Sequence, residues 1–461
     1  MPAKRKQLTV SLVALGCPKN LVDSERMLAD LAAAGCVVAA PTDDADVVVI
    51  NTCGFLAAAR DEALEAIAEA VEHKRAGRVR RVVVAGCLPS RDGERLFERA
   101  DGIDALVGVN NRDDLLAAVL ETGRSSRIDA CPRGGRTCPD DRGRFRLTPR
   151  HTAYLRIAEG CSQRCTYCTV PAIRGAFRSK PPEGVLAEAR ELVADGAVEL
   201  NVIAQNTAAY GTDLRDGEGG RPSLASLLRR LDEVDGLEWI RLLYTYPRRF
   251  TDELIDVLAG AGRLVPYVDI PLQHVADGVL KRMGRGVSRA GVESLLDKLR
   301  RRVEGLVLRT TFIVGFPGET EQEFAELLRF VEDFRFDALG VFEFSPEEGT
   351  PAARMPDQVL DAVKARRAGR IMLAQQHIAF ENSASAVGRP VVVLVDGRDE
   401  SGRGVGRHRG QAPEIDSRCI LTEPRPAGHF VQGEVVAAAG YDLVVKPGEP
   451  AGNRRSTSDA G

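Results

Sequence analysis

The chain is organised around the stretch Glu159-Gly160-Cys161-Ser162-Gln163-Arg164-Cys165-Thr166-Tyr167-Cys168. Its cysteines have the spacing C-x₃-C-x₂-C, and an aromatic residue precedes the last of them. Three thiolates do not close a tetrahedral zinc site, which takes four ligands. They can hold three irons of a cubane iron–sulfur cluster and leave the fourth iron open to a reacting ligand. A zinc knuckle that lacks one ligand and three buried thiols are the alternatives.

This spacing, together with Tyr167, resembles the radical S-adenosylmethionine (SAM) superfamily. The resemblance implies a 4Fe-4S cluster on Cys161, Cys165 and Cys168, whose open iron binds the amino and carboxylate groups of SAM. It also implies cleavage of SAM to a 5′-deoxyadenosyl radical. The protein then positions the cofactor and excludes water and wrong substrates.

Length and composition indicate a multidomain protein that is not embedded in a membrane. A chain of 461 residues with 44% hydrophobic and 28% charged residues is expected to form two or three globular domains. We expect neither a membrane span nor a secretory signal. Ten cysteines indicate metal ligands in a reducing cytoplasm. A net charge of −3 disfavours a large nucleic-acid surface, and we expect no DNA partner.

The amino-terminal third predicts an α/β domain with a doubly wound parallel sheet. Apolar runs at 8–15, 46–50 and 81–85 are predicted strands, and helical patterns at 22–34, 57–70 and 94–99 alternate with them. Loops that follow parallel strands gather at one edge of the sheet, where ligands bind. Cys17, Cys53 and Cys87 follow the three strands, so we expect them at that edge. They predict a second cubane cluster with one open iron, and three unrelated core thiols are the alternative.

The remaining cysteines do not fit either trio. Cys36 follows a glycine at a helix end and is interpreted as a small core residue. Cys131 and Cys138 lie in a segment rich in glycine and proline, for which an exposed linker is favoured over a redox pair or a metal clip. Cys419 is given no role.

The middle of the chain predicts a partial (β/α)6 barrel. Candidate strands are 154–158, 200–204, 239–243, 267–270, 308–314 and 339–344, and candidate helices are 185–195, 224–233, 252–258, 289–302 and 321–334. Six parallel strands fall short of the eight of a closed barrel, and the open side can admit a large substrate. Ligand-binding loops are expected at the carboxyl ends of these strands.

Several polar and glycine-marked segments fall at those ends. The resemblance implies SAM contacts from Tyr167, Gln205, Asn206 and Gly315, and it assigns no catalytic residue. His274 is interpreted as a hydrogen-bonded loop histidine in preference to a catalytic one. Lys281, Arg282 and Arg285 form a basic cluster, for which a solvated surface is favoured over contact with an acidic side chain or phosphate.

The carboxyl-terminal segment predicts a small antiparallel β-barrel. Short strands are expected at 389–396, 403–409, 420–421 and 431–437, and the pattern resembles the OB-like TRAM domain. Its charges cancel, because residues 388–446 contain eight basic and eight acidic residues, and its only aromatics are Phe430 and Tyr441. RNA binding favours a basic groove with stacking aromatics, so the balance leaves room for a protein partner.

This order of domains resembles the methylthiotransferase family over nearly the whole chain. The expected division is 1–125 for the auxiliary-cluster domain, 126–146 for a linker, 147–376 for the radical SAM core, 377–447 for the TRAM domain and 448–461 for a disordered tail. One branch of the family modifies an adenosine in tRNA (MiaB-like), and the other modifies an aspartate of protein twelve of the small ribosomal subunit.

Four segments resemble the ribosomal branch. They are Gly16-Cys17-Pro18-Lys19-Asn20-Leu21-Val22-Asp23-Ser24-Glu25, Tyr244-Thr245-Tyr246-Pro247, Pro271-Leu272-Gln273-His274 and Gln411-Ala412-Pro413-Glu414-Ile415-Asp416. Asn206 is a departure, since relatives commonly have aspartate there, although an amide can still accept and donate hydrogen bonds.

The resemblance implies methylthio transfer to the β-carbon of that aspartate. Two 4Fe-4S clusters would take part, with SAM as both methyl donor and radical source. The implied partners are protein twelve, free or ribosome-bound, and an electron donor such as flavodoxin or ferredoxin. The alternatives are tRNA methylthiolation and a non-enzymatic iron–sulfur sensor or ribosome assembly factor.

Overall fold

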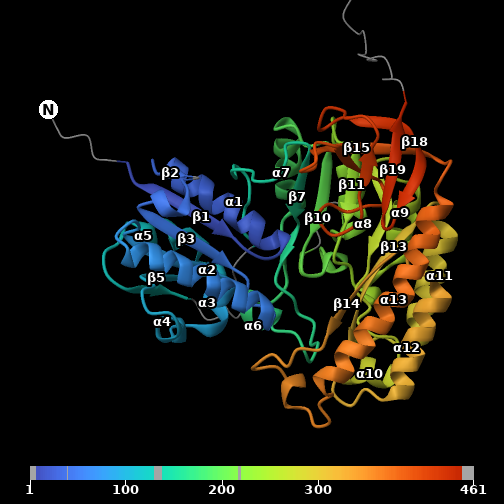
Figure 1. Ribbon diagram of the computed structural model, residues 1–461, viewed down its shortest axis with the longest axis horizontal. Coiled ribbons are helices and arrows are strands. Elements are labelled where there is room, and N and C mark those ends of the chain that lie inside the picture. Colours follow the sequence, from blue (N-terminus) through green and yellow to red (C-terminus); the bar gives the residue numbers. More distant parts are fainter. Residues whose placement is uncertain (1–6, 39, 129–137, 216–219, 449–461) are drawn as a thin grey trace, which may run out of the picture.

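The computed structural model describes residues 7–38, 40–128, 138–215 and 220–448, which form three parts (Figure 1). An amino-terminal α/β domain lies beside a central α/β core, and a small barrel covers one end of that core. Cys131 and the part of the predicted tail from residue 449 onward lie outside the described residues. The division into domains expected from the sequence stays a prediction.

The amino-terminal domain contains a six-stranded parallel sheet in the order β2-β1-β3-β4-β5-β6. The strands are β1 (Thr9–Ala14), β2 (Val37–Val38), β3 (Val47–Thr52), β4 (Arg81–Gly86), β5 (Ala105–Gly108) and β6 (Ser125–Arg127). Side chains of α1 (Pro18–Ala33) and α5 (Leu115–Leu120) pack on one face, and those of α2 (Ala57–Arg75) and α4 (Arg95–Arg99) pack on the other. The doubly wound prediction is confirmed, and the sequence did not reveal β2, β5 and β6, which are short.

The central core is a second parallel sheet of six strands, in the order β14-β13-β12-β11-β10-β7. They are β7 (Thr152–Arg156), β10 (Glu199–Ile203), β11 (Trp239–Leu242), β12 (Leu264–Asp269), β13 (Val307–Val314) and β14 (Ala338–Glu343). The main helices are α7 (Pro182–Ala194), α8 (Leu224–Asp232), α9 (Asp252–Gly260), α11 (Arg289–Arg302) and α12 (Glu321–Phe334). The predicted partial barrel is therefore confirmed.

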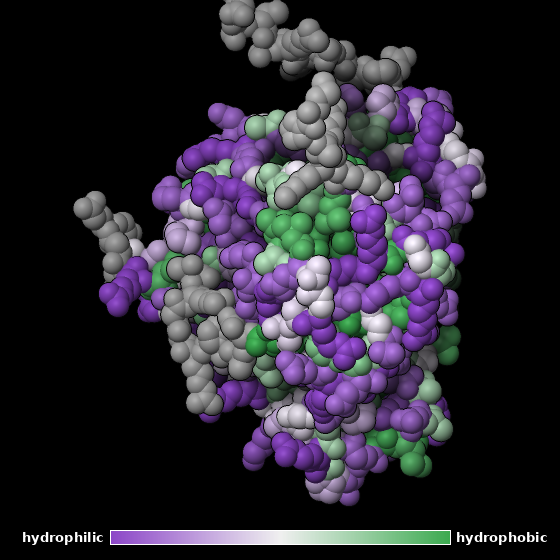
Figure 2. All heavy atoms as spheres, turned by 90° about the vertical axis from the view of Figure 1, so that its left-hand side faces the viewer, coloured by the Kyte–Doolittle hydropathy of each residue, from purple (hydrophilic) through white to green (hydrophobic). Residues whose placement is uncertain are grey.

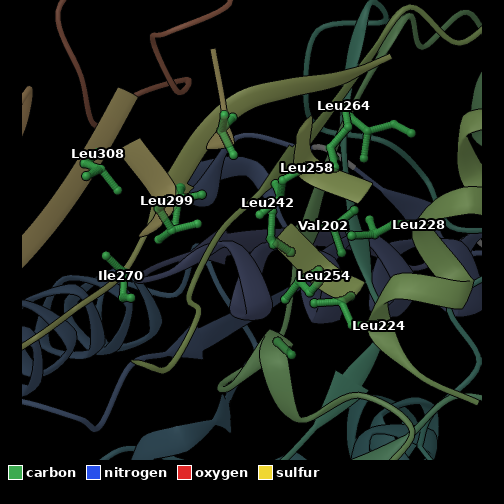
Figure 3. Close-up of a cluster of buried hydrophobic side chains, with 14 of the residues drawn as sticks. Val202, Leu224, Leu228, Leu242, Leu254, Leu258, Leu264, Ile270, Leu299 and Leu308 are labelled. Carbon is green, nitrogen blue, oxygen red and sulfur yellow. The ribbon is translucent and has the colours of Figure 1, made fainter. Parts of the chain in front are cut away.

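A large apolar cluster joins this sheet to its helices. Figure 3 shows Val202 and Leu242 from the strands directed toward Leu224, Leu228 and Leu254 from α8 and α9. Four of these side chains are at most 2% exposed, and Leu224 is 4% exposed. This burial holds the strands rigidly, so the loops at their carboxyl ends have a firm base.

Side chains from the amino-terminal domain and from the carboxyl-terminal barrel fill the open side of the central partial barrel. Tyr154 and Tyr267 of the sheet are buried in one cluster with Val22 of α1 and with Ala412, which follows β16 (Gly404–His408). The Tyr267 hydroxyl donates to Asp416 Oδ2 at 2.7 Å. Both the amino-terminal domain and the carboxyl-terminal barrel therefore pack against the interior of the core.

The carboxyl-terminal barrel is closed in the order β15-β16-β17-β19-β18. It follows the long helix α13 (Asp361–Ser385), and its remaining strands are β15 (Pro390–Arg398), β17 (Cys419–Leu421), β18 (Phe430–Ala439) and β19 (Asp442–Pro447). The sequence did not reveal β19. Because β17 and β19 pair in parallel, the prediction of an antiparallel barrel is wrong for that one pair.

Charged residues cover much of the outside of the molecule. Seen from the side of the amino-terminal domain, the surface is mostly hydrophilic, with a compact hydrophobic area in the upper half of the view (Figure 2). None of the helices in the described ranges is both long and apolar enough to cross a membrane.

Candidate functional site

Cys161, Cys165 and Cys168, the first cysteine trio, lie in a loop between β8 (Ala158–Glu159) and α6 (Val170–Arg174). The Cys161 amide donates to the Gly175 carbonyl at 3.0 Å, and the Cys168 amide donates to the Cys165 carbonyl at 3.2 Å. Burial raises the pKa of the Cys168 thiol to about 12 and also raises the pKa of Cys161. A positively charged partner would help these thiols ionise, as metal ligation requires.

Gly160 allows this loop to close. Its φ is +77°, and a Cβ atom there would lie 2.3 Å from the Ala176 carbonyl oxygen. Any side chain would therefore collide with the backbone that closes the loop. Position 160 therefore requires a glycine for steric reasons, which the sequence pattern alone does not reveal.

The second trio follows three neighbouring strands. Cys17 comes shortly after β1, Cys53 directly after β3 and Cys87 directly after β4, and these strands are adjacent in the sheet. A Cβ atom on Gly16 would lie 2.7 Å from the Cys53 Cβ atom, which shows how closely the first two loops approach. The structure therefore brings the three cysteines to one edge of the sheet, as the sequence predicts. No three His, Cys, Asp or Glu side chains in the described part of the chain are placed to share a single metal ion.

Arg174 connects the two cysteine loops. It ends the helix that follows Cys168, and its Nη2 atom lies 3.3 Å from Cys87 Sγ and 2.5 Å from Asn20 Oδ1. Its Nη1 atom lies 3.0 Å from Glu159 Oε1. Burial raises the pKa of Cys87 to about 12, and Arg174 is the strongest influence that lowers it. The guanidinium therefore favours a thiolate on the second trio while it is held by the segment that carries the first.

A buried ionic network supports Arg174. Arg156, which is fully buried, pairs with Asp23, Glu159 and Asp141 at 2.6–2.7 Å. Burial raises the pKa of Glu159, but Arg174 and Arg156 outweigh that effect and bring it to about 2. Glu159 is therefore ionised at neutral pH and holds both arginines beside the Cys161 loop.

A second contact between domains supports the Cys53 loop. Arg91 donates to the Gly54 carbonyl at 2.7 Å and to Glu347 Oε2 at 2.8 Å. Glu347 follows β14 of the core, and its other oxygen accepts from the Ala57 amide at 3.0 Å. The Cys53 loop is thus tied to the core through a buried carboxylate.

The Cys17 loop contacts the core through Lys19. Its Nζ atom lies 3.1 Å from the centroid of the Tyr244 ring, close enough for a cation–π interaction. Burial by itself raises the pKa of the Cys17 thiol. The positive charges of Lys19 and Arg174 lower that pKa by more, so the net shift is downward. Each of the three cysteine loops therefore has its own polar contact with the core.

Three of the four residues expected to contact SAM lie at the carboxyl ends of core strands, and Tyr167 lies in the loop of the first trio. Gln205 and Asn206 follow β10, Gly315 follows β13, and Tyr167 packs its ring edge-on against Phe316 at 6.4 Å. Gln205 donates to Glu159 Oε1 at 2.8 Å. Within the described residues, Gln205 Oε1 and Asn206 Oδ1 are buried acceptors without a hydrogen-bond partner. Such orphaned acceptors fit a ligand that brings a donor, and the ammonium group of SAM is one.

Three interpretations from the sequence can be compared with the structure. His274 is fully buried and its Nδ1 accepts from the Ala276 amide at 3.0 Å, so it is the hydrogen-bonded loop histidine that we predicted. The expected solvated basic surface is wrong for Arg285, which is 5% exposed and lies 3.9 Å from Cys165 Sγ. The expected exposed linker is wrong for Cys138, which is 6% exposed because it packs beside the buried network of Arg156 and Lys180.

The sequence also pointed to none of Arg174, Glu347 and Arg91. Each is an ordinary charged residue in a helix or loop, and its partner lies far away in the chain. No local spacing marks such residues, because their roles arise only when the two domains meet.

Comparisons with known proteins agree with this arrangement. Residues 155–331 match the radical SAM superfamily, residues 387–447 match the TRAM domain, and residues 9–108 match a family described as uncharacterised protein family UPF0004. The chain is 43% identical over 439 residues to the ribosomal protein uS12 methylthiotransferase RimO of Geotalea uraniireducens, covering 94% of this chain and 97% of that one. It is 46% identical over 438 residues to the RimO of Anaeromyxobacter sp. strain K, covering 94% and 92%.

A solved structure shares the fold at low sequence identity. The radical SAM methyltransferase TsrM of Kitasatospora setae, with tryptophan substrate and a SAM analogue bound, superposes with a TM-score of 0.53 at 17% identity. The match covers 86% of this chain and 79% of TsrM. It supports the arrangement of an amino-terminal α/β domain beside a radical SAM barrel.

Proposed function

The chain belongs to the RimO family of ribosomal protein uS12 methylthiotransferases, which are radical SAM enzymes, and we propose that it adds a methylthio group to the β-carbon of an aspartate in protein uS12. The observation that carries the proposal is the junction between the two cysteine trios. Three loops of the amino-terminal domain, each with one cysteine, meet the core through Lys19, Glu347 and Arg174. Two separate metal centres that act on one substrate require such a fixed relation.

We assign the cofactors to the two trios. Cys161, Cys165 and Cys168 would hold the cluster that binds SAM, and Cys17, Cys53 and Cys87 would hold a second cluster. Bound there, the clusters and SAM supply a radical that removes hydrogen from carbon and a source of methylated sulfur.

The surrounding side chains have supporting roles in this proposal. Gln205 and Asn206 offer buried acceptors to the SAM ammonium group. Arg174 favours the thiolate form of Cys87 and connects the loops of the two trios. Arg285, which is buried beside Cys165, supplies a positive charge to the first trio.

The carboxyl-terminal barrel supports a protein substrate over tRNA. Phe430 stacks edge-on against Trp239 of the core at 4.8 Å, and Tyr441 does so against Phe380 at 5.1 Å. Phe430 is therefore packed against the core, whereas Tyr441 keeps 43% of its surface exposed. Recognition of single-stranded RNA uses several free aromatic faces, and this barrel offers one largely exposed aromatic ring.

Mass spectrometry of uS12 tests the proposal directly. Anaerobically reconstituted protein with SAM, dithionite and uS12 should give uS12 with a methylthio group on one aspartate, and about eight irons per chain. The variant Cys17→Ala/Cys53→Ala/Cys87→Ala should bind about four irons, still form 5′-deoxyadenosine and give no methylthiolated uS12. Methylthio-adenosine in tRNA together with unmodified uS12 would refute the proposal.

A further inference from the structure

Lys19 is a buried cation that lacks a carboxylate of its own. Its side chain is 7% exposed and lies over the Tyr244 ring, and the strongest attraction on it comes from Cys17, which the proposed second cluster would take as a ligand. The two carboxylates that also attract it are already bound to arginines, since Glu159 pairs with Arg156 and Arg174 and Asp269 pairs with Arg309. Burying an ammonium group that has no carboxylate partner of its own is costly, so the site favours an incoming carboxylate.

The position of Lys19 in its helix adds to this surplus of positive charge. It is the second residue of α1, whose first turn contains no acidic residue. A helix amino terminus carries partial positive charge, so a cation placed there is unfavourable unless an anion accompanies it. The Arg174 guanidinium also acts on Lys19 and increases the local positive potential.

Tyr244 holds this cation at the active edge of the core. The residue has φ +58°, which is uncommon for a residue with a bulky side chain. Its amide donates to Asp269 Oδ2 at 3.0 Å, and its carbonyl accepts from the Thr207 amide at 3.1 Å, so both sides of the strained residue are fixed. Strain of this kind is found where a side chain must be placed for function. The ring thus supports Lys19 between the Cys17 loop and the strand end that carries Asn206.

We propose that the Lys19 ammonium group binds the side-chain carboxylate of the target aspartate and thereby orients its β-carbon. The inference rests on the proposed function, because it takes an aspartyl protein as substrate. A cation at this point also supplies specificity: it favours an aspartate and gives no such preference to an asparagine or a neutral nucleobase.

A double-mutant cycle tests this contact. Binding of uS12, with either aspartate or asparagine at the target position, is measured by fluorescence anisotropy to reconstituted enzyme with SAM and no reductant. Lys19→Met should weaken binding of the aspartate form by roughly tenfold to a hundredfold, as expected for a hydrogen bond between charged groups. It should leave binding of the asparagine form nearly unchanged, and Lys19→Arg should retain part of the preference for aspartate. Equal losses for both forms, or no loss for either, would overturn the proposal.

Further measurements separate this inference from the alternatives. Lys298→Met removes a partly exposed lysine from α11, far in sequence from the cysteine loops, and should change the affinity for neither form. If Lys19 served the Cys17 cluster instead, Lys19→Met would lower iron content and alter the cluster's electron paramagnetic resonance spectrum with no dependence on the substrate residue, and the inference would fail. If the methionine variant does not retain iron, Lys19→Gln is used instead to compare binding of the aspartate and asparagine forms of uS12. Failure of the unaltered enzyme to modify uS12 would refute the proposed function itself.

Discussion

Replacing Arg174 by glutamine should both destabilise the protein and empty the second cysteine trio. The guanidinium reaches four partners at once, and glutamine is neutral and too short to do so. They are Cys87 Sγ at 3.3 Å, Asn20 Oδ1 at 2.5 Å, Glu159 Oε1 at 3.0 Å and Asp23 Oδ2 at 3.2 Å. The side chain is 5% exposed, so water cannot replace the lost contacts freely.

The expected loss of stability can be worked out in two ways. Breaking a buried ion pair costs about 3–5 kcal/mol, and the low end applies because Glu159 and Asp23 both keep Arg156. Independently, arginines lower the pKa of Glu159 from 4.5 to about 2 against the effect of burial. At about 1.4 kcal/mol per pKa unit this shift corresponds to about 3–4 kcal/mol, shared between Arg174 and Arg156. This contribution is fully present above pH 4.5 and is lost as the pH falls toward 2, so at neutral pH we expect a loss of about 2–3 kcal/mol.

Urea unfolding followed by circular dichroism at neutral pH measures this loss, and iron analysis after anaerobic reconstitution measures the second effect. Iron should fall from about eight toward about four per chain, since the Cys87 thiol loses the cation that favours its ionisation. Arg178→Gln is the matched control, because Arg178 lies in the same segment and, among the residues that the structure describes, its side chain donates to the Arg174 carbonyl alone. Unchanged stability together with about eight irons in Arg174→Gln would refute the reasoning.

Three further substitutions test other parts of the site. Glu347→Gln removes the charge that holds Arg91, so methylthio transfer to uS12 should fall roughly tenfold to a hundredfold while 5′-deoxyadenosine formation continues, as product analysis can show. Gly160→Ala places a Cβ atom 2.3 Å from the Ala176 carbonyl oxygen, so the first trio should lose its iron and SAM cleavage should cease. Glu199→Gln leaves the buried Arg241 and Arg407 without their shared carboxylate, and urea unfolding should show a loss of about 3 kcal/mol.

The sequence predicted the elements whose signals are local. Helices α11 and α12 were predicted with the bounds that the structure has. In the structure Ser288 and Thr320 cap them by accepting amide hydrogen bonds. The second trio was found because cysteines followed apolar runs, and parallel strands bring such positions to one edge.

What the sequence could not reveal depends on contacts between distant segments. Arg174 meets Cys87 across 87 positions, and Arg91 meets Glu347 across 256. Arg285 was mistaken for a surface charge because its neighbours Lys281 and Arg282 suggested a basic patch, whereas tertiary packing buries it over the Tyr246 ring. Charged residues have no periodic signature that separates a buried ion pair from a solvated one.

The polar character of the junction between the trios has a physical reason. Apolar contacts are non-directional, so an apolar interface between the two domains would tolerate small shifts of one metal site relative to the other. Hydrogen bonds between arginine and carboxylate fix distance and orientation, although buried ion pairs add little net stability. Arg174 and Glu347 both belong to the core but carry opposite charges, since Arg174 pairs with Asp23 and Glu347 pairs with Arg91 of the amino-terminal domain. Such a pair of contacts resists both sliding and rotation of one trio relative to the other, as the proposed use of both trios on one substrate would require.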